Sequence, residues 1–400
     1  MEQRGFIVIA DITGYTTYLN ESELEHAQGT LTDLLTLLID HTQRPLIISR
    51  LEGDAVISYG LETGFVTGQT FLETIEKTYI DFRNAIELMV LNNTCQCNAC
   101  ANVSALDLKF FVHFGSFVLQ TIGDHDELLG TDVNLIHRLL KNTVTADTGI
   151  RAYLLCTDAA LEALGLDASE AMVRHTEAVP DLGEASMWIM DMAPVYATGA
   201  DDRIVFTPDE LIGAFAVDVS LPQHVVWDYM SDLEFRKVLL GSDRQEVTDL
   251  KSGRVAPGTS YQCFHGNKSY SQVVLEWRPF ERVVVEQTLE LPGGPATMVL
   301  DYQLTQIDGG TRLTATAARL SGSGLRRVLW RSMVKTVGRR WQQQLELFRD
   351  HIEADAERRQ RAGPAPTIEI GSIARSAAGG VAEWNAGTPG IGDSPPTGDL

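Results

Sequence analysis

Long apolar runs are missing from the sequence. A membrane-spanning helix needs about 20 consecutive, mostly apolar residues, whereas the first apolar run, residues 6–10, ends at Asp11. The chain also lacks the basic start and long apolar core of a secretory signal. We therefore expect a cytoplasmic protein without a membrane span.

Basic residues are scarce compared with acidic ones. The chain has 32 Lys and Arg against 54 Asp and Glu, which gives a formal net charge of −22. Because nucleic-acid binding depends on neutralising phosphates, this charge argues against a nucleic-acid partner, and it also disfavours an anionic membrane surface. Cysteine is scarce too. The five cysteines are expected to be thiols or metal ligands, because disulfides are rare in the cytoplasm.

The length of the chain predicts more than one domain. At 400 residues it exceeds one ordinary hydrophobic core, and its apolar (44%) and charged (22%) fractions are those of a soluble globular protein. We predict two α+β domains, residues 1–195 and 213–355, joined by a linker over 196–212, where Pro and Gly interrupt the pattern. Residues 356–400 are rich in Gly, Pro, Ser and Ala without periodicity, which predicts a disordered tail.

The order of elements in the first part indicates a ferredoxin-like sheet. Helical spacing of apolar residues alternates with strand-like runs. The predicted elements are a strand ending at Asp11, a helix over 22–41, a hairpin over 45–60, a helix over 69–91, a strand over 106–123 and a helix over 132–142. This βαββαβ order is typical of a split βαβ fold.

The first strand, FIVIA, runs directly into Asp11 and a Thr-Gly turn. A buried charge is costly unless it is paired, so Asp11 either caps the next helix or holds a cation. A ferredoxin-like sheet brings the hairpin turn with Asp54 beside it. Two adjacent carboxylates repel each other unless a divalent cation such as Mg²⁺ or Mn²⁺ neutralises them. Backbone N–H groups of the turn after Asp11 would then cradle a triphosphate. The positions of this turn are Ile12, Thr13, Gly14 and Tyr15.

A second pair of polar residues lies four positions apart on the helix predicted over 132–142. Asn134 and Arg138 would point the same way. An amide beside a guanidinium suits a phosphoryl group that gains charge in a transition state. The alternative is an ordinary solvated helix face, which this spacing by itself favours. His137 is interpreted as a surface or interface residue that points elsewhere.

Together these segments resemble the class III nucleotide cyclases over about residues 5–192. FIVIADITGYT is similar to the family's first strand with its metal-binding Asp, and RLEGDAV to the hairpin with the second one. LDLKFFVHFG resembles the strand before the last motif, and GTDVNLIHRLL the G-x-x-V-N-x-x-x-R-[LM] helix. The pattern is nearest to an uncharacterised bacterial group related to these enzymes. The resemblance implies that Asp11 and Asp54 bind two Mg²⁺ or Mn²⁺ ions. It also implies that Asn134 and Arg138 stabilise the transition state from the other subunit of a homodimer.

The resemblance further assigns base choice to Arg50 and Glu127, whose charge order is that of adenylate cyclases and favours ATP over GTP. Three features depart from the family. VPDLGEASMW, residues 179–188, lacks the triphosphate-binding Lys, and Glu52 adds a third carboxylate that would bind metal or disturb the site. CQCNAC, residues 95–100, is inserted just before the LDLKFFVHFG strand. The predicted activity is conversion of ATP to cyclic AMP. The alternative is nucleotide binding without turnover.

Cys95, Cys97 and Cys100 form a C-x-C-x₂-C cluster. Three thiolates at this spacing can bind one tetrahedral ion, most simply Zn²⁺. His113 and Cys156 are the candidates for a fourth ligand. The alternative is a loop of reduced thiols, which the lack of a fourth nearby cysteine favours.

In the second part, strands separated by Pro and Gly turns predict an antiparallel sheet closed by one long helix. AFAVDVSLPQHVVWDYMSDL, WRPFERVVVE and DYQLTQIDGGTRLTATAA resemble the START-like and polyketide-cyclase-like helix-grip domains. The resemblance implies a cavity for a small hydrophobic ligand, and we expect a regulatory module. Four large residues could either line this cavity or simply pack in the hydrophobic core. They are Tyr261, Trp277, Met298 and Trp341. A non-catalytic nucleotide and small-molecule sensor is the alternative for the whole chain.

Overall fold

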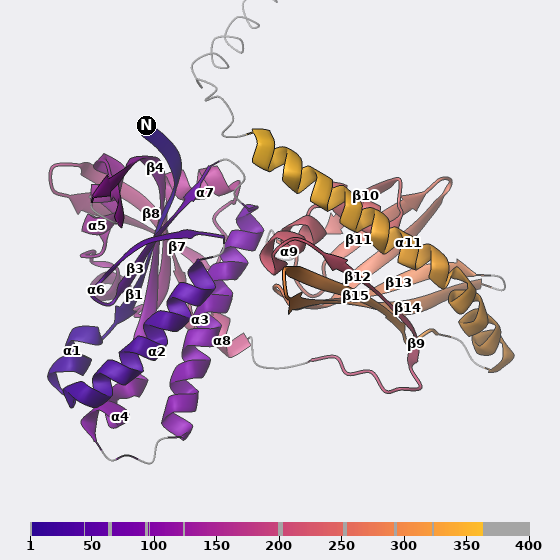
Figure 1. The fold of residues 1–400 in the computed structure, drawn as a ribbon, viewed down its shortest axis with the longest axis horizontal. Coiled ribbons are helices and arrows are strands. Elements are labelled where there is room, and N and C mark those ends of the chain that lie inside the picture. Colours follow the sequence, from indigo (N-terminus) through magenta and orange to yellow (C-terminus); the bar gives the residue numbers. More distant parts are fainter. Residues whose placement is uncertain are drawn as a thin grey trace, which may run out of the picture. The chain divides into compact units, whose positions relative to one another are not determined.

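The computed structural model describes residues 2–362 except 44, 63–65, 93, 94, 96, 123, 124, 199–202, 251–253, 292, 293, 322 and 323. By contacts between residues, Met1–Arg361 form one compact unit. This unit contains two sheets, each with its own set of helices (Figure 1). No helix among the described residues is both long and apolar enough to cross a membrane.

The first sheet has eight strands. Seven follow the order β2–β3–β1–β4–β6–β8–β7, and β5 pairs with β4. The strands are β1 (Glu2–Thr13), β2 (Ile47–Glu52), β3 (Ala55–Leu61), β4 (Asp107–Ile122), β5 (His125–Leu129), β6 (Tyr153–Thr157), β7 (Met172–Val179) and β8 (Gly183–Asp191). Strand β1 is antiparallel to both of its neighbours, and β4 runs parallel to β6.

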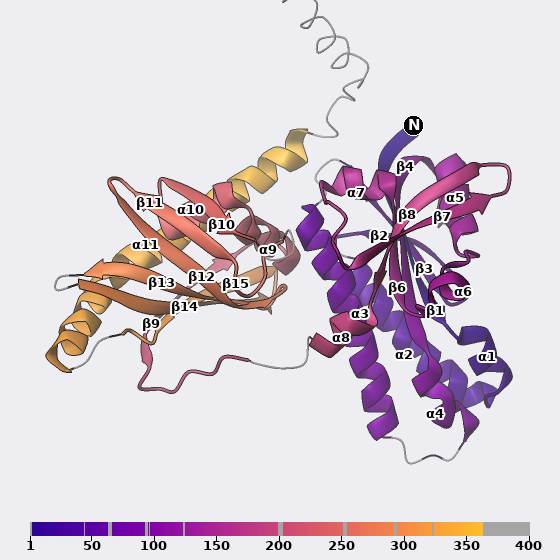
Figure 2. The same cartoon turned by 180° about the vertical axis from the view of Figure 1, so that it is seen from behind.

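Strand β1 is apolar over residues 6–10 because helices cover both faces of the sheet. Phe6, Val8 and Ala10 pack under α2 (Leu24–Thr42) and α3 (Gly68–Leu91). Ile7 and Ile9 face the other core, which α5 (Thr131–Leu139) and α6 (Val144–Thr148) cover. With β4 and β3 on either side of β1, the elements β1–α2–β2–β3–α3–β4 form a split βαβ unit (Figure 2). The remaining helices of this part are α1 (Tyr15–Asn20), α4 (Asn98–Asn102), a 3₁₀ turn (Val103–Ala105), α7 (Asp158–Leu164) and α8 (Ala193–Thr198).

The second sheet has seven strands in the order β10–β11–β12–β13–β14–β15–β9, all antiparallel. They are β9 (Leu211–Val219), β10 (Arg244–Asp249), β11 (Ser260–His265), β12 (Lys268–Arg278), β13 (Arg282–Leu291), β14 (Gly294–Ile307) and β15 (Gly310–Ala318). Helices α9 (Gln223–Ser231) and α10 (Leu233–Leu240) follow β9, and α11 (Gly324–Ala362) follows the last strand. Leu345, Phe348 and Ile352 of α11 are buried in the core of this sheet.

A glycine allows α11 to approach the sheet closely. A Cβ atom at Gly338 would lie 2.7 Å from Cζ of Phe215, too near for any side chain without movement of that ring. Phe215 in turn makes an edge contact with Trp341, with ring centroids 5.8 Å apart. The aromatic pair therefore fills the space beside the small residue.

The α+β class is confirmed, and the strands and helices predicted for both sheets are present. Several details differ. Strands β5 to β8 of the first sheet and β10 of the second sheet were not predicted. Helix α8 ends and β9 begins inside the predicted linker. Helix α11 runs to Ala362, so residues 356–362 are helical and were wrongly included in the disordered tail. Their arginines and carboxylates form i,i+3 and i,i+4 ion pairs that stabilise the last turns of the helix. The rest of that tail, 363–400, lies outside the described residues.

Candidate functional site

Asp11 and Asp54 meet at one end of the first sheet. Asp11 follows the buried part of β1 and lies opposite Ala55 in the register with β3. Asp54 is in the tight β2–β3 turn, where Gly53 has a φ of 64°. The backbone joins the two segments, because the N–H of Ile12 donates to the carbonyl oxygen of Asp54 at 3.3 Å.

The two carboxylates share one electrostatic environment. Burial and, to a lesser extent, the charge of Asp54 raise the pKa of Asp11 to about 6, although the ammonium of Lys109 opposes both. Burial also raises the pKa of Asp54. Two partly buried oxygen donors that repel each other are a ligand set that suits a hard divalent cation such as Mg²⁺ or Mn²⁺.

Lys109 is a neighbour that the sequence did not predict. It lies opposite Asp11 in the β1–β4 register, and its Nζ is 5.0 Å from the centre of the Tyr153 ring. Burial lowers the pKa of Lys109, and the charge of Asp11 raises it. One ammonium therefore balances part of the charge of the Asp pair and leaves room for a cation to balance the rest.

The turn after Asp11 begins a short helix, α1. Gly14 has a φ of 90°, and a Cβ atom there would lie 3.3 Å from the carbonyl oxygen of Ala105, so glycine is required at this position. The backbone N–H of Ile12 is occupied by Asp54, which is incompatible with its predicted role as a phosphate donor. The predicted cradle is thereby reduced to Thr13, Gly14 and Tyr15. Thr13 Oγ1 is buried and has no hydrogen-bond partner among the described residues.

Asn134 and Arg138 both lie on the exposed side of α5, as the four-residue spacing predicted. The guanidinium of Arg138 is 3.7 Å from the carboxylate of Asp181, in the β7–β8 turn. That turn lies within residues 179–188, the segment in which the sequence analysis noted the missing Lys. The side chains of Arg138 and Asp181 are 47% and 87% exposed, so this ion pair is weak and can open.

Arg50 and Glu127, the predicted base-choice residues, form an ion pair between β2 and β5. Glu52 and His137 complete this cluster. Glu52 lies 3.3 Å from Arg50 and 3.8 Å from His137 Nδ1, and Nε2 of His137 lies 3.5 Å from Arg50. Glu52 therefore belongs to this cluster, and among the described residues it forms no ion pair at the Asp11–Asp54 site. Burial lowers the pKa of His137, Glu52 raises it, and Arg50 lowers it. From the sequence, His137 was interpreted as a surface or interface residue without a role in this cluster.

The structure thus sorts the predicted residues into two groups. Asp11 and Asp54 are at the end of β1, and Arg50 and Glu127 lie with His137 of α5, the helix that also carries Asn134 and Arg138. The apolar residues before Asp11 on its face of the sheet, Ile7 and Ile9, belong to the core that α5 covers. Among the described residues, no hydrogen bond or ion pair joins the two groups within one chain.

The cysteine cluster has a fourth member, and it is neither of the predicted candidates. His26, in the first turn of α2, lies with Cys95, Cys97 and Cys100. His113 instead contacts Thr157 at 2.9 Å and Asp132 at 3.5 Å, inside the first sheet. Cys156 is buried in β6, where burial raises the pKa of its thiol to about 12.

A cavity of about 360 Å³ lies between α11 and the second sheet. Of the four large residues that the sequence analysis considered as cavity lining, Met298 and Trp341 line this cavity. Tyr261 is buried in the core, and Trp277 donates its indole N–H to Glu73 at 2.6 Å. The rest of the lining combines apolar side chains such as Leu239, Leu300, Ala315 and Leu345 with polar ones such as His265, Gln287, Arg340 and Gln344. A cavity of this size suits a small, largely apolar ligand that carries a polar group.

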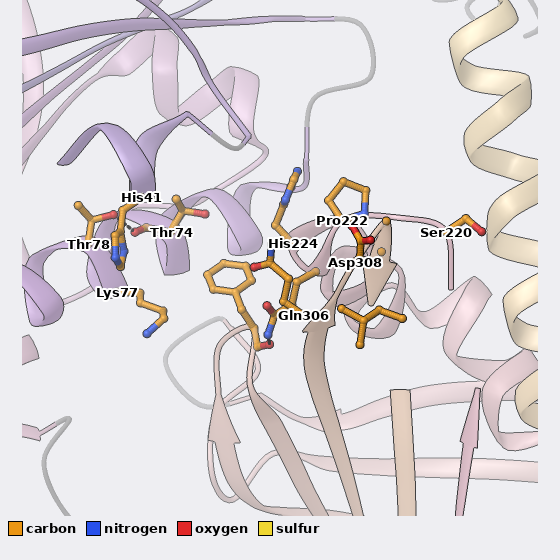
Figure 3. Close-up of a pocket in the computed structure, with 14 residues that line it drawn as sticks. His41, Thr74, Lys77, Thr78, Ser220, Pro222, His224, Gln306 and Asp308 are labelled. Carbon is orange, nitrogen blue, oxygen red and sulfur yellow. Dashed lines mark hydrogen bonds between the residues drawn. The ribbon is translucent and has the colours of Figure 1, made fainter. Parts of the chain in front are cut away.

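A larger cavity, about 790 Å³, lies where α2 and α3 face His224 at the start of α9 and Asp308 in the β14–β15 turn (Figure 3). Its cation, Lys77, is already 3.0 Å from Asp81 and 3.2 Å from Glu281. These two carboxylates neutralise the ammonium, which makes this cavity a poor site for a phosphate group.

Two sequence comparisons match parts of the chain. A family model described as a protein of unknown function (DUF2652) matches residues 31–148. The uncharacterized protein Rv2561/Rv2562 of Mycobacterium tuberculosis (strain ATCC 25618 / H37Rv) is 27% identical over 212 residues, which cover 53% of this chain and 92% of that protein.

The similar solved structures include nucleotidyl cyclases at low identity. A bacterial light-regulated adenylyl cyclase is 14% identical, with a TM-score of 0.38, over 48% of this chain and 53% of that one, so the chain spans about half of that protein's length. The guanylate cyclase domain of RhGC from Catenaria anguillulae, in complex with GTP, is 16% identical over 47% and 97% of the two chains, with a TM-score of 0.33. The guanylyl cyclase Cya2 is 15% identical over 47% and 92%, with a TM-score of 0.35.

Proposed function

We propose that the chain is a metal-dependent nucleotidyl cyclase that converts ATP to 3′,5′-cyclic AMP and pyrophosphate. The observation that carries the proposal is the meeting of Asp11 and Asp54 at the end of β1, where burial and mutual repulsion raise the pKa of Asp11 to about 6. A core that is otherwise apolar tolerates two such carboxylates at its edge because a cation can bind between them.

The chemistry is an in-line displacement. The 3′-hydroxyl oxygen of ATP bonds to the α-phosphorus, the bond from that phosphorus to the α,β-bridging oxygen breaks, pyrophosphate leaves and the 3′ proton passes to solvent. Mg²⁺ or Mn²⁺ held by Asp11 and Asp54 would supply Lewis acidity for the attacking and leaving oxygens. Asn134 and Arg138 would donate hydrogen bonds to the phosphoryl oxygens as their charge grows.

In this proposal the two groups are half-sites, which makes a homodimer part of it. The Asp pair of one protomer would face Asn134 and Arg138 of its partner, since no hydrogen bond or ion pair joins the two groups among the described residues of one chain. The substrate would lie between them, with its base against Arg50 and Glu127. Glu127 can accept the adenine amino hydrogens while the guanidinium of Arg50 donates to N1 of adenine, an atom that carries a hydrogen in guanine, so the pair together favours ATP over GTP.

The direct test is cyclic nucleotide formation by the purified full chain with Mn²⁺ and ATP. Asp54→Asn should lower the rate by at least about 100-fold, because removal of one ligand charge weakens the metal site. Asp33→Asn, which changes an exposed carboxylate of α2, serves as the matched control and should leave the rate unchanged. No product from the wild-type chain, or equal product from Asp54→Asn, would end the enzymatic proposal.

The ion pair of Arg138 with Asp181 favours a second candidate, nucleotide binding without turnover. In this case the acidic turn holds the arginine away from the substrate and repels the triphosphate. Isothermal titration separates the two candidates. ATP binding in the presence of Mn²⁺ without cyclic product from wild type, and with product from Asp181→Lys, would identify a silenced site.

The second sheet is proposed as the regulatory module. Its cavity of about 360 Å³ offers an apolar ligand a site between sheet and helix. Binding there would reach the first sheet through Glu73 of α3, which accepts hydrogen bonds from Trp227 and Trp277. We expect an apolar compound to change the cyclase rate of the wild-type chain. A variant with a larger side chain in the cavity should not show this change.

A further inference from the structure

We propose that His26, Cys95, Cys97 and Cys100 form a binding site for one zinc ion. The four potential ligand atoms all lie within 4.8 Å of one another. Around a tetrahedral zinc ion, with bonds of about 2.0–2.3 Å, ligand atoms are about 3.5–3.8 Å apart. Nδ1 of His26 is already 3.2 Å from Sγ of Cys97 and 3.7 Å from Sγ of Cys95. The cluster therefore needs only a small contraction to close around an ion.

The backbone around α4 positions two of the thiols for metal binding. Cys97 is the N-terminal cap of α4, and its Sγ accepts a hydrogen bond from the N–H of Cys100 at 3.4 Å. This turn sets the two sulfurs of the C-x₂-C pair on the same side. An N–H···S bond also stabilises a thiolate, which is the form that binds metal.

His26 reaches the cluster from a distant part of the sequence. It is 71 positions from Cys97 and lies in the first turn of α2. The same junction has a second contact, because Glu23 accepts a hydrogen bond from the N–H of Ala99 at 3.1 Å. The start of α2 is thus fixed against α4 without any ion, and this positions the imidazole beside the thiols.

The donor set favours zinc over the ions expected at Asp11 and Asp54. Three sulfur donors and one imidazole are soft and borderline ligands, which select Zn²⁺, whereas Mg²⁺ and Mn²⁺ prefer oxygen. Four protein ligands leave no open position, which indicates a structural ion. Its consequence would be to hold α4 on α2 and on α1, the helix that directly follows the Asp11 turn.

Metal analysis of the full chain tests the site independently of any catalysis. The wild-type protein, purified under reducing conditions, should contain about one zinc per chain. Cys97→Ala should reduce this content at least tenfold. Cys156→Ala is the matched control, since that thiol is buried in β6 and outside the cluster, and it should keep the full zinc content.

The role of His26 needs its own variant. His26→Ala changes an exposed side chain, so the protein should fold, as checked by circular dichroism, while its zinc affinity against a competing chelator falls at least tenfold. Loaded with Co²⁺, wild type should show the visible bands of a tetrahedral thiolate site, and His26→Ala should shift them.

Three results would overturn the proposal. The first is less than a tenth of an equivalent of zinc both as purified and after anaerobic reduction with added zinc. The second is iron in place of zinc. The third is unchanged zinc affinity and an unchanged Co²⁺ spectrum in His26→Ala, which would remove His26 from the site. None of these results depends on whether the chain turns over ATP.

Discussion

Trp227 donates its indole N–H to Oε2 of Glu73 at 2.7 Å and so joins α9 to α3, 154 positions apart in the sequence. Trp277 and Gln69 donate to Oε1 of the same carboxylate at 2.6 and 2.9 Å. Glu73 is only 2% exposed, and burial raises its pKa to about 7 although these three hydrogen bonds lower it. A single buried carboxylate thus connects helices that belong to the two halves of the chain.

This carboxylate makes stability depend on pH. Its folded pKa of about 7 exceeds the ordinary value of 4.5, so the folded state binds the proton more tightly than the unfolded state. The contribution is fully present below about pH 4.5 and is lost as pH rises through 7. It amounts to about 3 kcal/mol. We expect the free energy of unfolding, measured with urea, to fall between pH 5 and pH 8, and Glu73→Gln to flatten this dependence.

The control for the pH experiment is Glu87→Gln, which changes an exposed carboxylate on the same helix and should leave the slope as in wild type. Glu73→Gln should also cost about 1–3 kcal/mol at low pH, because its amide NH₂ cannot accept one of the two indole N–H groups. An unchanged pH slope in Glu73→Gln would show that another group titrates.

The division into half-sites predicts complementation between inactive variants. Asp54→Asn and Arg138→Ala should each be inactive as pure homodimers. Refolding them together in equal amounts makes half of the dimers mixed, and each mixed dimer has one intact site out of two. The mixture should therefore regain about a quarter of the wild-type rate. Mixing Asp54→Asn with Asp11→Asn is the control and should restore nothing. If neither mixture regains activity, the Asp pair and the Asn134–Arg138 pair of one site must come from the same chain.

Base choice is predicted to depend on the Arg50–Glu127 pair. Glu127→Ala removes the acceptor for the adenine amino group, so kcat/KM for ATP relative to GTP should fall by about tenfold or more. Glu52→Ala is the matched control. Glu52 also contacts Arg50, but its side chain is 57% exposed, and its removal should leave the ratio within about twofold. If both substitutions lower the ATP-to-GTP ratio equally, the preference for ATP depends on the overall negative charge of the cluster and not on Glu127 in particular.

Local patterns were enough to predict the first strand and its final carboxylate. A central strand covered on both faces is apolar at every position, so its end is visible in the sequence where Asp11 begins. The hairpin with Asp54 was predictable for the same reason, since β3 is buried from Ala55 onward and Gly53 marks the turn before it. The facing of Asn134 and Arg138 followed from helical periodicity alone.

The missed residues all depend on contacts between distant segments. Lys109 meets Asp11 only through the β1–β4 register, which no local pattern encodes. His26 joins the cysteines across 71 positions. Glu73 stands in the buried stripe of α3, and no local signal distinguishes it from a solvated residue until Trp227 is placed beside it. The types and spacing of residues along the sequence predict helices and strands. Which side chains contact each other depends on how those helices and strands pack.

The cavity between α11 and the second sheet gives the last prediction. Ala315 of β15 is partly buried and lines this space of about 360 Å³. Ala315→Leu should fill part of it without replacing any polar contact, so binding of the dye 1-anilinonaphthalene-8-sulfonate, followed by fluorescence, should weaken at least tenfold while the melting temperature stays near that of wild type. Ala214→Leu, at an exposed position of β9, adds the same side chain outside the cavity and should bind the dye as wild type does. Equal dye binding by Ala315→Leu and wild type would show that the ligand site lies elsewhere, because a leucine projecting into the cavity must compete with any molecule bound there.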